Sequence, residues 1–473
     1  MKCYNTSKVI LMNTLFKAVN ITLPKVILQE KIAGNLDEAI RLIDEYLINE
    51  KDNNIKNSLL IQKDIIKRLP FEYSISYLEG YNSLKSYVND LTLEEFDHLL
   101  ATNKIDWIYI NHQKYLFNRF LSVLFKNEDN IIARVTNKHP IITQNEKNSY
   151  EDNLLNDVIA KMIKNKHYLN HFTISCTLKL QDDHFSKDHY LVHLPIPCHD
   201  KYQHNITINK IYPDNGMIND GLQATLCFDN KMENNHEYMV EYSYDIDIPY
   251  FDMEKALSSK EHLKYEQKDF DTDEQLPHII FTPLLKQTVD QLSANINDPL
   301  LKAKAFYDYI TLNMHYRFMP SYIILDNIID NILINKSGDC GIFALLFITM
   351  CRYSKIPCRW QSGYTSYQGF CSGHDWVQIY IEPYGWIYVD PSYGVDAHHL
   401  NNEWRRRFYF GNIDPYRTII NNDFYKELVH PKKYLRADPY DNQCGEIENT
   451  HQGFQFGEFS SIRKVIKCEG EEK

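Results

Sequence analysis

The feature that most constrains the fold is Gly338-Asp339-Cys340-Gly341 and the apolar run that follows it. No glycine or proline interrupts that run until Pro357. A polar turn that opens into a long apolar run predicts a buried helix with Cys340 in its first turn. The N-terminus of a helix carries partial positive charge and unpaired N–H groups, which favour a thiolate over a thiol. We therefore expect Cys340 to be a reactive cysteine.

Two later motifs can complete a cysteine-nucleophile site. His374 stands in Gly-His-Asp-Trp, and Asp390 stands in Val-Asp-Pro-Ser. A thiol that attacks an amide needs a group that exchanges its proton, and an imidazole needs a partner that fixes its orientation. We expect His374 to be the general base and acid, and Asp390 to orient it.

The register of two predicted strands decides whether these residues meet. Segments 374–381 and 386–390 read as strands, joined by the turn residues Glu-Pro-Tyr-Gly. If facing residues have numbers that sum to an even value, His374 and Asp390 share a face of the sheet. A slip by one residue places them on opposite faces. The sequence leaves this register open.

Composition limits the class of protein. A length of 473 residues predicts more than one domain, and a net charge of −12 argues against nucleic acid or an anionic membrane as partner. The N-terminus has no signal-peptide pattern and no run reaches transmembrane length, so we expect a cytoplasmic protein. Ten irregularly spaced cysteines indicate reduced thiols. Without a Cys-x-x-Cys pair or a phosphate-binding glycine loop, we expect neither a metal nor a cofactor.

The periodicity of apolar residues predicts a multi-domain α+β protein. We expect a helical region over 1–150, with a capped helix start at Thr92 and a polar linker near 136–153. Alternating runs predict an antiparallel, sandwich-like β domain over 165–250. A catalytic core is expected over 276–440, including helices near 284–296 and 300–312, and a C-terminal tail over 441–473 that is frayed at 468–473.

The motifs around the three candidate residues resemble the transglutaminase-like superfamily, most closely its bacterial members, which are related to papain-like thiol enzymes. The resemblance rests on Gly338-Asp339-Cys340-Gly341, Gly373-His374-Asp375-Trp376-Val377 and Gly385-Trp386-Ile387-Tyr388-Val389-Asp390-Pro391-Ser392, and covers about 280–395. It implies a papain-like α+β core with a Cys-His-Asp triad at Cys340, His374 and Asp390. In the family's cross-linking members a tryptophan upstream of the cysteine supports the oxyanion. No tryptophan lies between Trp107 and Trp360, so Tyr316 and Trp376 are the candidates for the oxyanion or the cleft.

Two functions remain open at this point. The first is a thiol enzyme that acts on peptide or isopeptide bonds of a protein or peptide substrate through an acyl-cysteine, with hydrolysis slightly favoured over cross-linking. The second is a binding or scaffold protein that keeps the fold without turnover, because a fold does not settle a reaction. The resemblance brings no calcium site, since no loop of EF-hand type is present. The oligomeric state is not determined by the sequence.

Overall fold

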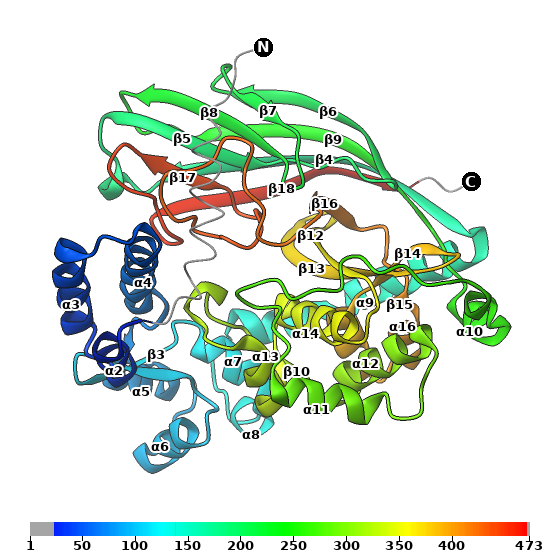
Figure 1. Ribbon diagram of the computed structural model, residues 1–473, viewed down its shortest axis with the longest axis horizontal. Helices are drawn as coiled ribbons and strands as arrows, with labels where there is room; N and C mark the ends of the chain where they lie inside the picture. The colour runs from blue at the N-terminus through cyan, green and yellow to red at the C-terminus, as the bar shows by residue number, and fades with distance from the viewer. Residues whose placement is uncertain (1–22, 138, 471–473) are drawn as a thin grey trace.

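A five-stranded antiparallel sheet carries the candidate site in the computed structural model, which describes residues 23–137 and 139–470 (Figure 1). The strand order is β15-β14-β13-β12-β16. These strands are β12 (Cys358–Tyr367), β13 (Phe370–Ile381), β14 (Gly385–Val389), β15 (Phe410–Gly411) and β16 (Arg417–Asn421). The predicted hairpin of β13 and β14 therefore lies inside the sheet, with β12 on one side and β15 on the other.

Helix α14 (Cys340–Tyr353) packs on β12 and β13 and is buried from Gly341 to Arg352. Its burial follows from the apolar run, which leaves no polar face for solvent. The other helices of this layer are α11 (Pro283–Leu292), α12 (Pro299–Asn313), α13 (Ile328–Asn335), α15 (Pro391–His399) and α16 (Glu403–Phe408). The helices predicted near 284–296 and 300–312 are confirmed as α11 and α12, and both begin with a proline after a capping side chain.

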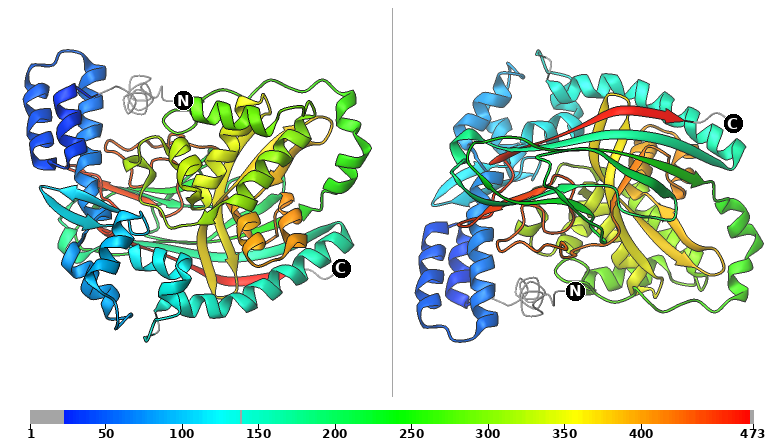
Figure 2. Two further views of the ribbon diagram at one scale, coloured as in Figure 1. Left: turned by 90° about the horizontal axis from the view of Figure 1, so that it is seen from below. Right: turned by 90° about the horizontal axis from the view of Figure 1, so that it is seen from above.

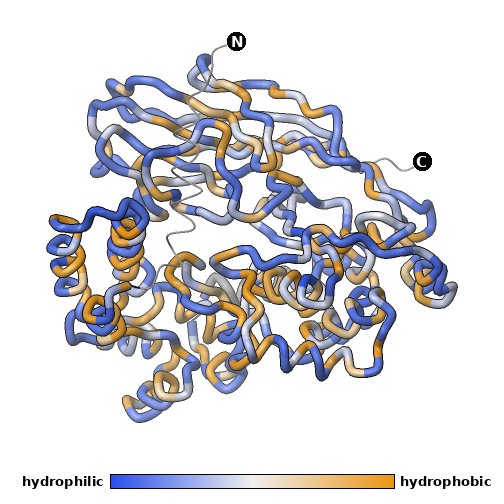
Figure 3. The backbone as a smooth tube through the Cα atoms, viewed as in Figure 1, coloured by the Kyte–Doolittle hydropathy of each residue, from blue (hydrophilic) through white to orange (hydrophobic). Residues whose placement is uncertain are grey.

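The β domain is a sandwich of two four-stranded antiparallel sheets, ordered β18-β4-β9-β6 and β17-β5-β8-β7. Buried and half-buried residues alternate along β4 and β9, and the alternation of hydropathy can be followed along the upper strands in Figure 3. The middle region is thus antiparallel β structure, as predicted. Its strands are β4 (His167–Leu180), β5 (Asp188–Pro195), β6 (Gln203–Tyr212), β7 (Met217–Asn219), β8 (Thr225–Met232), β9 (Tyr238–Pro249), β17 (Glu446–Asn449) and β18 (Phe459–Gly470).

The last two strands correct the expectation of a C-terminal tail over 441–473. β17 pairs with β5, and β18 pairs with β4 over almost its whole length. The charged end of the chain forms an edge strand whose polar side chains face solvent, while β4 satisfies its backbone groups. In Figure 2 the red strand β18 runs beside the strands of the middle region and crosses the hairpin of β12 and β13. Because β4 and β18 are far apart in the sequence, no local pattern predicts that they pair.

The N-terminal part is mainly helical but contains a small sheet, ordered β1-β3-β2. The capped start at Thr92 is confirmed, since its side chain accepts from the N–H of Glu95. The linker expected near 136–153 is instead mostly helix α9, which packs against β4. Residues 1–22 lie outside the described residues. The elements are α2 (Lys25–Ala33), α3 (Leu36–Asn49), α4 (Asn53–Glu72), β1 (Ile75–Ser76), α5 (Tyr77–Lys85), α6 (Leu93–Ala101), β2 (Trp107–Ile110), β3 (Gln113–Leu116), α7 (Phe120–Asn127), α8 (Asp129–Ile132) and α9 (Pro140–Asn165).

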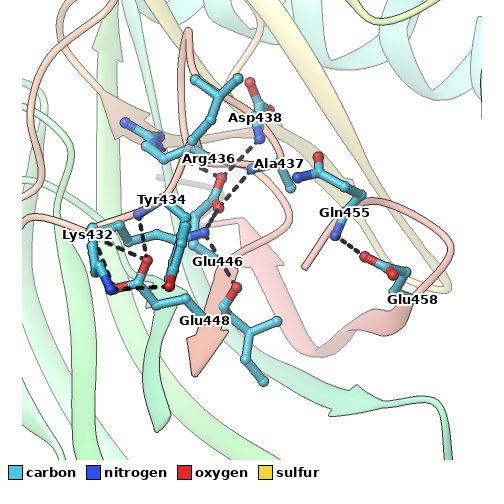
Figure 4. A network of polar contacts seen from close by, with 12 residues as sticks. Lys432, Tyr434, Arg436, Ala437, Asp438, Glu446, Glu448, Gln455 and Glu458 are labelled. Atoms are coloured by element: carbon cyan, nitrogen blue, oxygen red, sulfur yellow. Dashed lines mark hydrogen bonds and ion pairs between the residues drawn. The ribbon is translucent and has the colours of Figure 1, made fainter. Parts of the chain in front are cut away.

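A long loop over residues 422–445, here called the strap, connects the five-stranded sheet to β17. It is anchored by Glu446, which is fully buried and accepts from Lys432 Nζ at 2.7 Å and from the N–H groups of Ala437 and Asp438 at 2.8 Å (Figure 4). A buried carboxylate with a cation and two backbone donors is fully satisfied. The strap is therefore held in one conformation where it passes the candidate site.

One continuous cluster of buried apolar side chains extends through the sandwich, the five-stranded sheet and its helices. Contacts such as the ring pair of Tyr202 and Tyr388 join the β domain to the sheet. Because the layers share one core, the candidate site lies on a rigid support. Within the described ranges, no helix combines the length and the apolar character that crossing a membrane requires.

Candidate active site

Cys340 is the first residue of α14, as the sequence predicts. Asp339 caps the helix, its carboxylate accepting from the N–H of Ile342 at 3.2 Å. Cys340 is half-buried, and its Sγ donates to Oδ2 of Asp375 at 3.2 Å. The thiol therefore stands at a helix N-terminus but faces a carboxylate.

The pKa of Cys340 is shifted in the direction opposite to the one expected at a helix N-terminus. Burial, followed by the negative charges of Asp375 and Asp339, raises the pKa of Cys340 well above its ordinary value. A helix N-terminus lowers a thiol's pKa only in part, and carboxylates in contact with the sulfur oppose it. In this geometry Cys340 is a protonated thiol at neutral pH.

The close approach around the thiol depends on Gly341. A Cβ at this position would lie 2.3 Å from Oη of Tyr322 and 2.9 Å from Oδ2 of Asp375. Tyr322 in turn donates a hydrogen bond to Asp339. Burial raises the pKa of Asp339 to about 6 despite this bond. The glycine in Gly-Asp-Cys-Gly is therefore needed for space beside the nucleophile.

His374 and Asp390 are joined by a hydrogen bond, His374 Nε2 to Asp390 Oδ2, at 2.8 Å. The register pairs Val377 with Val389, so facing residues have an even sum. Asp390 is fully buried, directly follows β14 and caps α15 by accepting from the N–H of Tyr393 at 2.9 Å. This is the one of the two possible registers that places the imidazole against the carboxylate.

The hydrogen bonds of the described residues do not join Cys340 directly to His374. The sulfur bonds to Asp375 rather than to His374. Nε2 of His374 is bonded to Asp390, so Nδ1 is the ring nitrogen that this bond does not use.

Asp390 has a second cationic neighbour, Arg417. Arg417 Nη2 lies 3.1 Å from the same Oδ2 that His374 contacts, and 2.6 Å from Oδ2 of Asp414. Burial acts to raise the pKa of Asp390, but His374 and Arg417 lower it below its ordinary value. Asp390 is therefore ionised in the folded protein.

Asp375 belongs to a buried group of carboxyls that reaches the strap. Gln443 donates to Oδ1 of Asp375 at 2.6 Å, and Ser362 donates to Oδ2 of Asp441 at 2.6 Å. Burial, then the charge of Asp441, raises the pKa of Asp375 well above its ordinary value, and burial likewise raises the pKa of Asp441. Asp438 lies beside Asp441, and burial raises its pKa too. The carboxyl beside the thiol therefore loses its proton at a higher pH than an exposed aspartic acid does.

The two oxyanion or cleft candidates lie in different surroundings. Trp376 is fully buried, and its Nε1 donates to Gln361 at 2.7 Å, so its N–H is already used. Tyr316 is on β10 (His315–Tyr316), which pairs with β11 (Ser337–Gly338) just before Cys340. Lys126 Nζ lies 3.9 Å from the centre of its ring. Tyr316 is therefore the candidate that stands near the nucleophile.

Sequence reasoning missed three residues of this site: Asp375, Arg417 and Gln443. Asp375 had a usable signal, because it is a charged residue directly beside His374 in Gly-His-Asp-Trp. Arg417 and Gln443 had none, since they reach the site by folding back from the chain after residue 400. Within the described ranges, no group of three or more His, Cys, Asp or Glu is arranged to hold a metal ion.

Comparison with known protein families gives a match that lies within the part of the chain described above. Residues 286–391, which include Cys340, His374 and Asp390, match the model of the transglutaminase-like superfamily. The chain is 27% identical over 158 residues to the "Uncharacterized protein YebA" of Bacillus subtilis (strain 168). That match covers 30% of this chain and 21% of YebA, so the chain spans about a fifth of this relative.

Similar solved structures include two bacterial chains. The "Putative Cysteine Protease from Cytophaga hutchinsonii" is 14% identical with a TM-score of 0.40, covering 65% of this chain and 92% of that one. The periplasmic domain of TgpA from Pseudomonas aeruginosa is 13% identical with a TM-score of 0.28, covering 50% of this chain and 92% of that one.

Proposed function

Because residues 286–391 match the transglutaminase-like superfamily, we propose that this protein is a thiol enzyme that acts on amide bonds of proteins or peptides. The observation that carries the proposal is the bonded pair of His374 and Asp390 beside a helix that begins with Cys340. A buried imidazole with a carboxylate behind it is the arrangement that supports nucleophilic catalysis.

In the proposed reaction, substrate binding moves the sulfur of Cys340 from Asp375 to Nδ1 of His374. His374 takes the thiol proton, and the sulfur attacks the carbonyl carbon of the amide. The C–N bond then breaks, and the imidazolium gives its proton to the leaving amine, which leaves a thioester on Cys340. Asp390 keeps the imidazole in one tautomer and stabilises its charged form.

Water or an amine can complete the reaction. Attack by water on the thioester gives a carboxylic acid and returns the proton to the thiol, whereas attack by an amine gives a new amide. We favour hydrolysis slightly, as the sequence reading does, and the product distinguishes the two.

The second candidate is a scaffold that keeps the fold without turnover. The bond between the thiol and Asp375, and the raised pKa of Cys340, favour it. The pair of His374 and Asp390 argues against it. A fold kept only for packing does not need a buried imidazole that is hydrogen-bonded to a buried carboxylate.

The test is to trap the acyl-enzyme. The protein is incubated with a diverse peptide library, quenched in acid, and the peptide that contains Cys340 is examined by mass spectrometry. An acyl adduct on Cys340, absent in Cys340→Ala and present in Cys468→Ala, supports the enzyme; Cys468 is a half-buried cysteine on β18. His374→Gln should slow adduct formation about 100-fold or more. A thiol that alkylates but forms no adduct with any peptide supports the scaffold instead.

A further inference from the structure

Arg417 is a buried cation that touches the carboxylate behind His374. It lies on β16, outside the matched residues 286–391, and is fully buried. We propose that Arg417 and Asp414 are positioning residues that set the protonation of His374 through Oδ2 of Asp390. This proposal rests on the proposed role of His374 as the group that exchanges protons with Cys340.

Oδ2 of Asp390 is in contact with both His374 and Arg417. His374 Nε2 lies 2.8 Å from Oδ2 of Asp390, and Arg417 Nη2 lies 3.1 Å from the same atom. Two cationic groups on one carboxylate oxygen divide its charge between them. The stabilisation that Asp390 gives to a protonated His374 is therefore smaller than it would be without Arg417.

Arg417 cannot turn away from this position. Its Nη1 donates to Oγ1 of Thr365 at 3.1 Å, and its guanidinium lies 4.4 Å from the ring centre of Tyr393 and 5.5 Å from that of Trp376. A planar cation that lies over two aromatic rings and donates from both Nη atoms has one orientation. Its charge therefore acts on Asp390 from one fixed point.

Asp414 offsets the charge of Arg417. Its Oδ2 lies 2.6 Å from Arg417 Nη2 and also accepts from the hydroxyl of Tyr409 at 3.1 Å. Protonated His374, Asp390, Arg417 and Asp414 then form a row of alternating charge that sums to zero. With neutral His374 the buried row has a net charge of −1, which an apolar interior disfavours. Asp414 thus favours the imidazolium, and Arg417 opposes it.

The other titratable groups around this row do not change in the variants used below, so they cancel in the comparison. They face the row from α12, from α15, from the residue before β15 and, through Tyr393, from α9. These groups are Tyr307, Tyr393, Tyr409 and Glu151.

The test measures the titration of His374 directly. Histidine is labelled with ¹³C at Cε1 in a full-length Cys340→Ala protein, and the signal of His374 is assigned by its loss in His374→Gln. Asp414→Asn should lower the midpoint of the His374 titration by about one pH unit, because the charge of Arg417 is no longer offset. Arg417→Gln should raise it by about one unit. Thr365→Val, which removes a hydrogen bond of Arg417 without changing any charge, should leave it unchanged.

The opposite signs separate this role from simple support of the fold. Equal midpoints in Asp414→Asn and the parent, or a shift in Thr365→Val as large as in the charged variants, overturn the proposal. If Arg417→Gln does not fold, as judged by circular dichroism, the midpoint of the His374 titration in Asp414→Asn is compared with that in Thr365→Val, and this comparison still tests the proposal. Failure of both charge variants to fold assigns the pair a structural role only and also overturns it. Because the readout needs no turnover, the proposed function can fail, by absence of an acyl adduct, while this inference stands.

Discussion

The thiol of Cys340 donates its hydrogen bond to Asp375, with Sγ 3.2 Å from Oδ2, although His374 is the preceding residue of the strand. Strand β13 thus carries two adjacent proton acceptors, of which Asp375 is the one bonded to the sulfur. The carboxylate keeps the sulfur protonated, while the imidazole is fixed by Asp390. Activity under the proposed function requires a change of partner at a single sulfur atom.

Asp375→Asn should make Cys340 more reactive toward alkylating reagents. Removing the carboxylate removes a negative charge that raises the pKa of the thiol, so that pKa falls, by about one unit or more. The pH profile of iodoacetamide labelling, read by mass spectrometry of the Cys340 peptide, should move to lower pH. Asp290→Asn, which removes an exposed carboxylate on α11, is the matched control and should leave the profile in place. An unmoved profile in Asp375→Asn would show that Asp375 does not control the thiol.

Gly341→Ala should destabilise the protein by about 1–3 kcal/mol, because the added methyl group meets the hydroxyl of Tyr322. Chemical denaturation measures this loss. Tyr322→Phe removes that hydroxyl, so the double variant should recover part of the loss made by Gly341→Ala, with a coupling of about 0.5–3 kcal/mol. Strict additivity of the two changes would contradict the clash.

Glu446→Gln should destabilise the protein by about 3–5 kcal/mol, because it leaves Lys432 as a buried cation without its counterion. Glu469→Gln, on the exposed side of β18, should change stability by less than about 0.5 kcal/mol. Unfolding in urea distinguishes the two. A loss in Glu446→Gln no greater than in the control would show that the strap is not anchored there.

The same residue predicts a pH dependence. Lys432 and Arg436 hold the pKa of Glu446 below its ordinary value, although burial acts in the opposite direction. The ion pair therefore contributes stability above the pKa of the unfolded chain, about 4.3, and this contribution is lost as the pH falls through the lower, folded value. Thermal unfolding between pH 3 and 6 should show a steeper loss of stability in the parent than in Glu446→Gln. Parallel curves would contradict this linkage.

A chain that stops before Phe459 should not form the sandwich, because β4 would lose its edge partner over its full length. Solubility and the β signal in circular dichroism should fall sharply. A chain that ends at Gly470 keeps every described strand and serves as the control. A folded, soluble protein without β18 would show that this pairing is dispensable.

Local patterns in the sequence predict much of the core. The apolar run after Cys340 predicts α14, and the periodicity of apolar residues predicts α11 and α12, because helices and their buried faces are encoded over a few residues. The alternation over 165–250 predicts antiparallel strands for the same reason. The register between β13 and β14 stays open in the sequence, since a two-residue period is equally compatible with a slip by one.

The remaining errors come from contacts made over long sequence distances. The polar stretch near 136–153 reads as a linker until α9 packs on β4. The charged C-terminus reads as a tail until β4 pairs with it. Arg417 and Gln443 carry no motif, and only the return of the chain after β15 brings them to Asp390 and Asp375.

The position of β17 and β18 makes the five-stranded sheet and its helices an insertion within the β domain. The strands of the sandwich come from both sides of that insertion, so the edge at β4 stays unpaired until β18 has been synthesised. The inserted segment can therefore collapse while β4 still lacks its outer partner, and a chain released before Phe459 exposes a long unpaired strand. Pairing of β18 with β4 thus removes an edge at which such chains would associate.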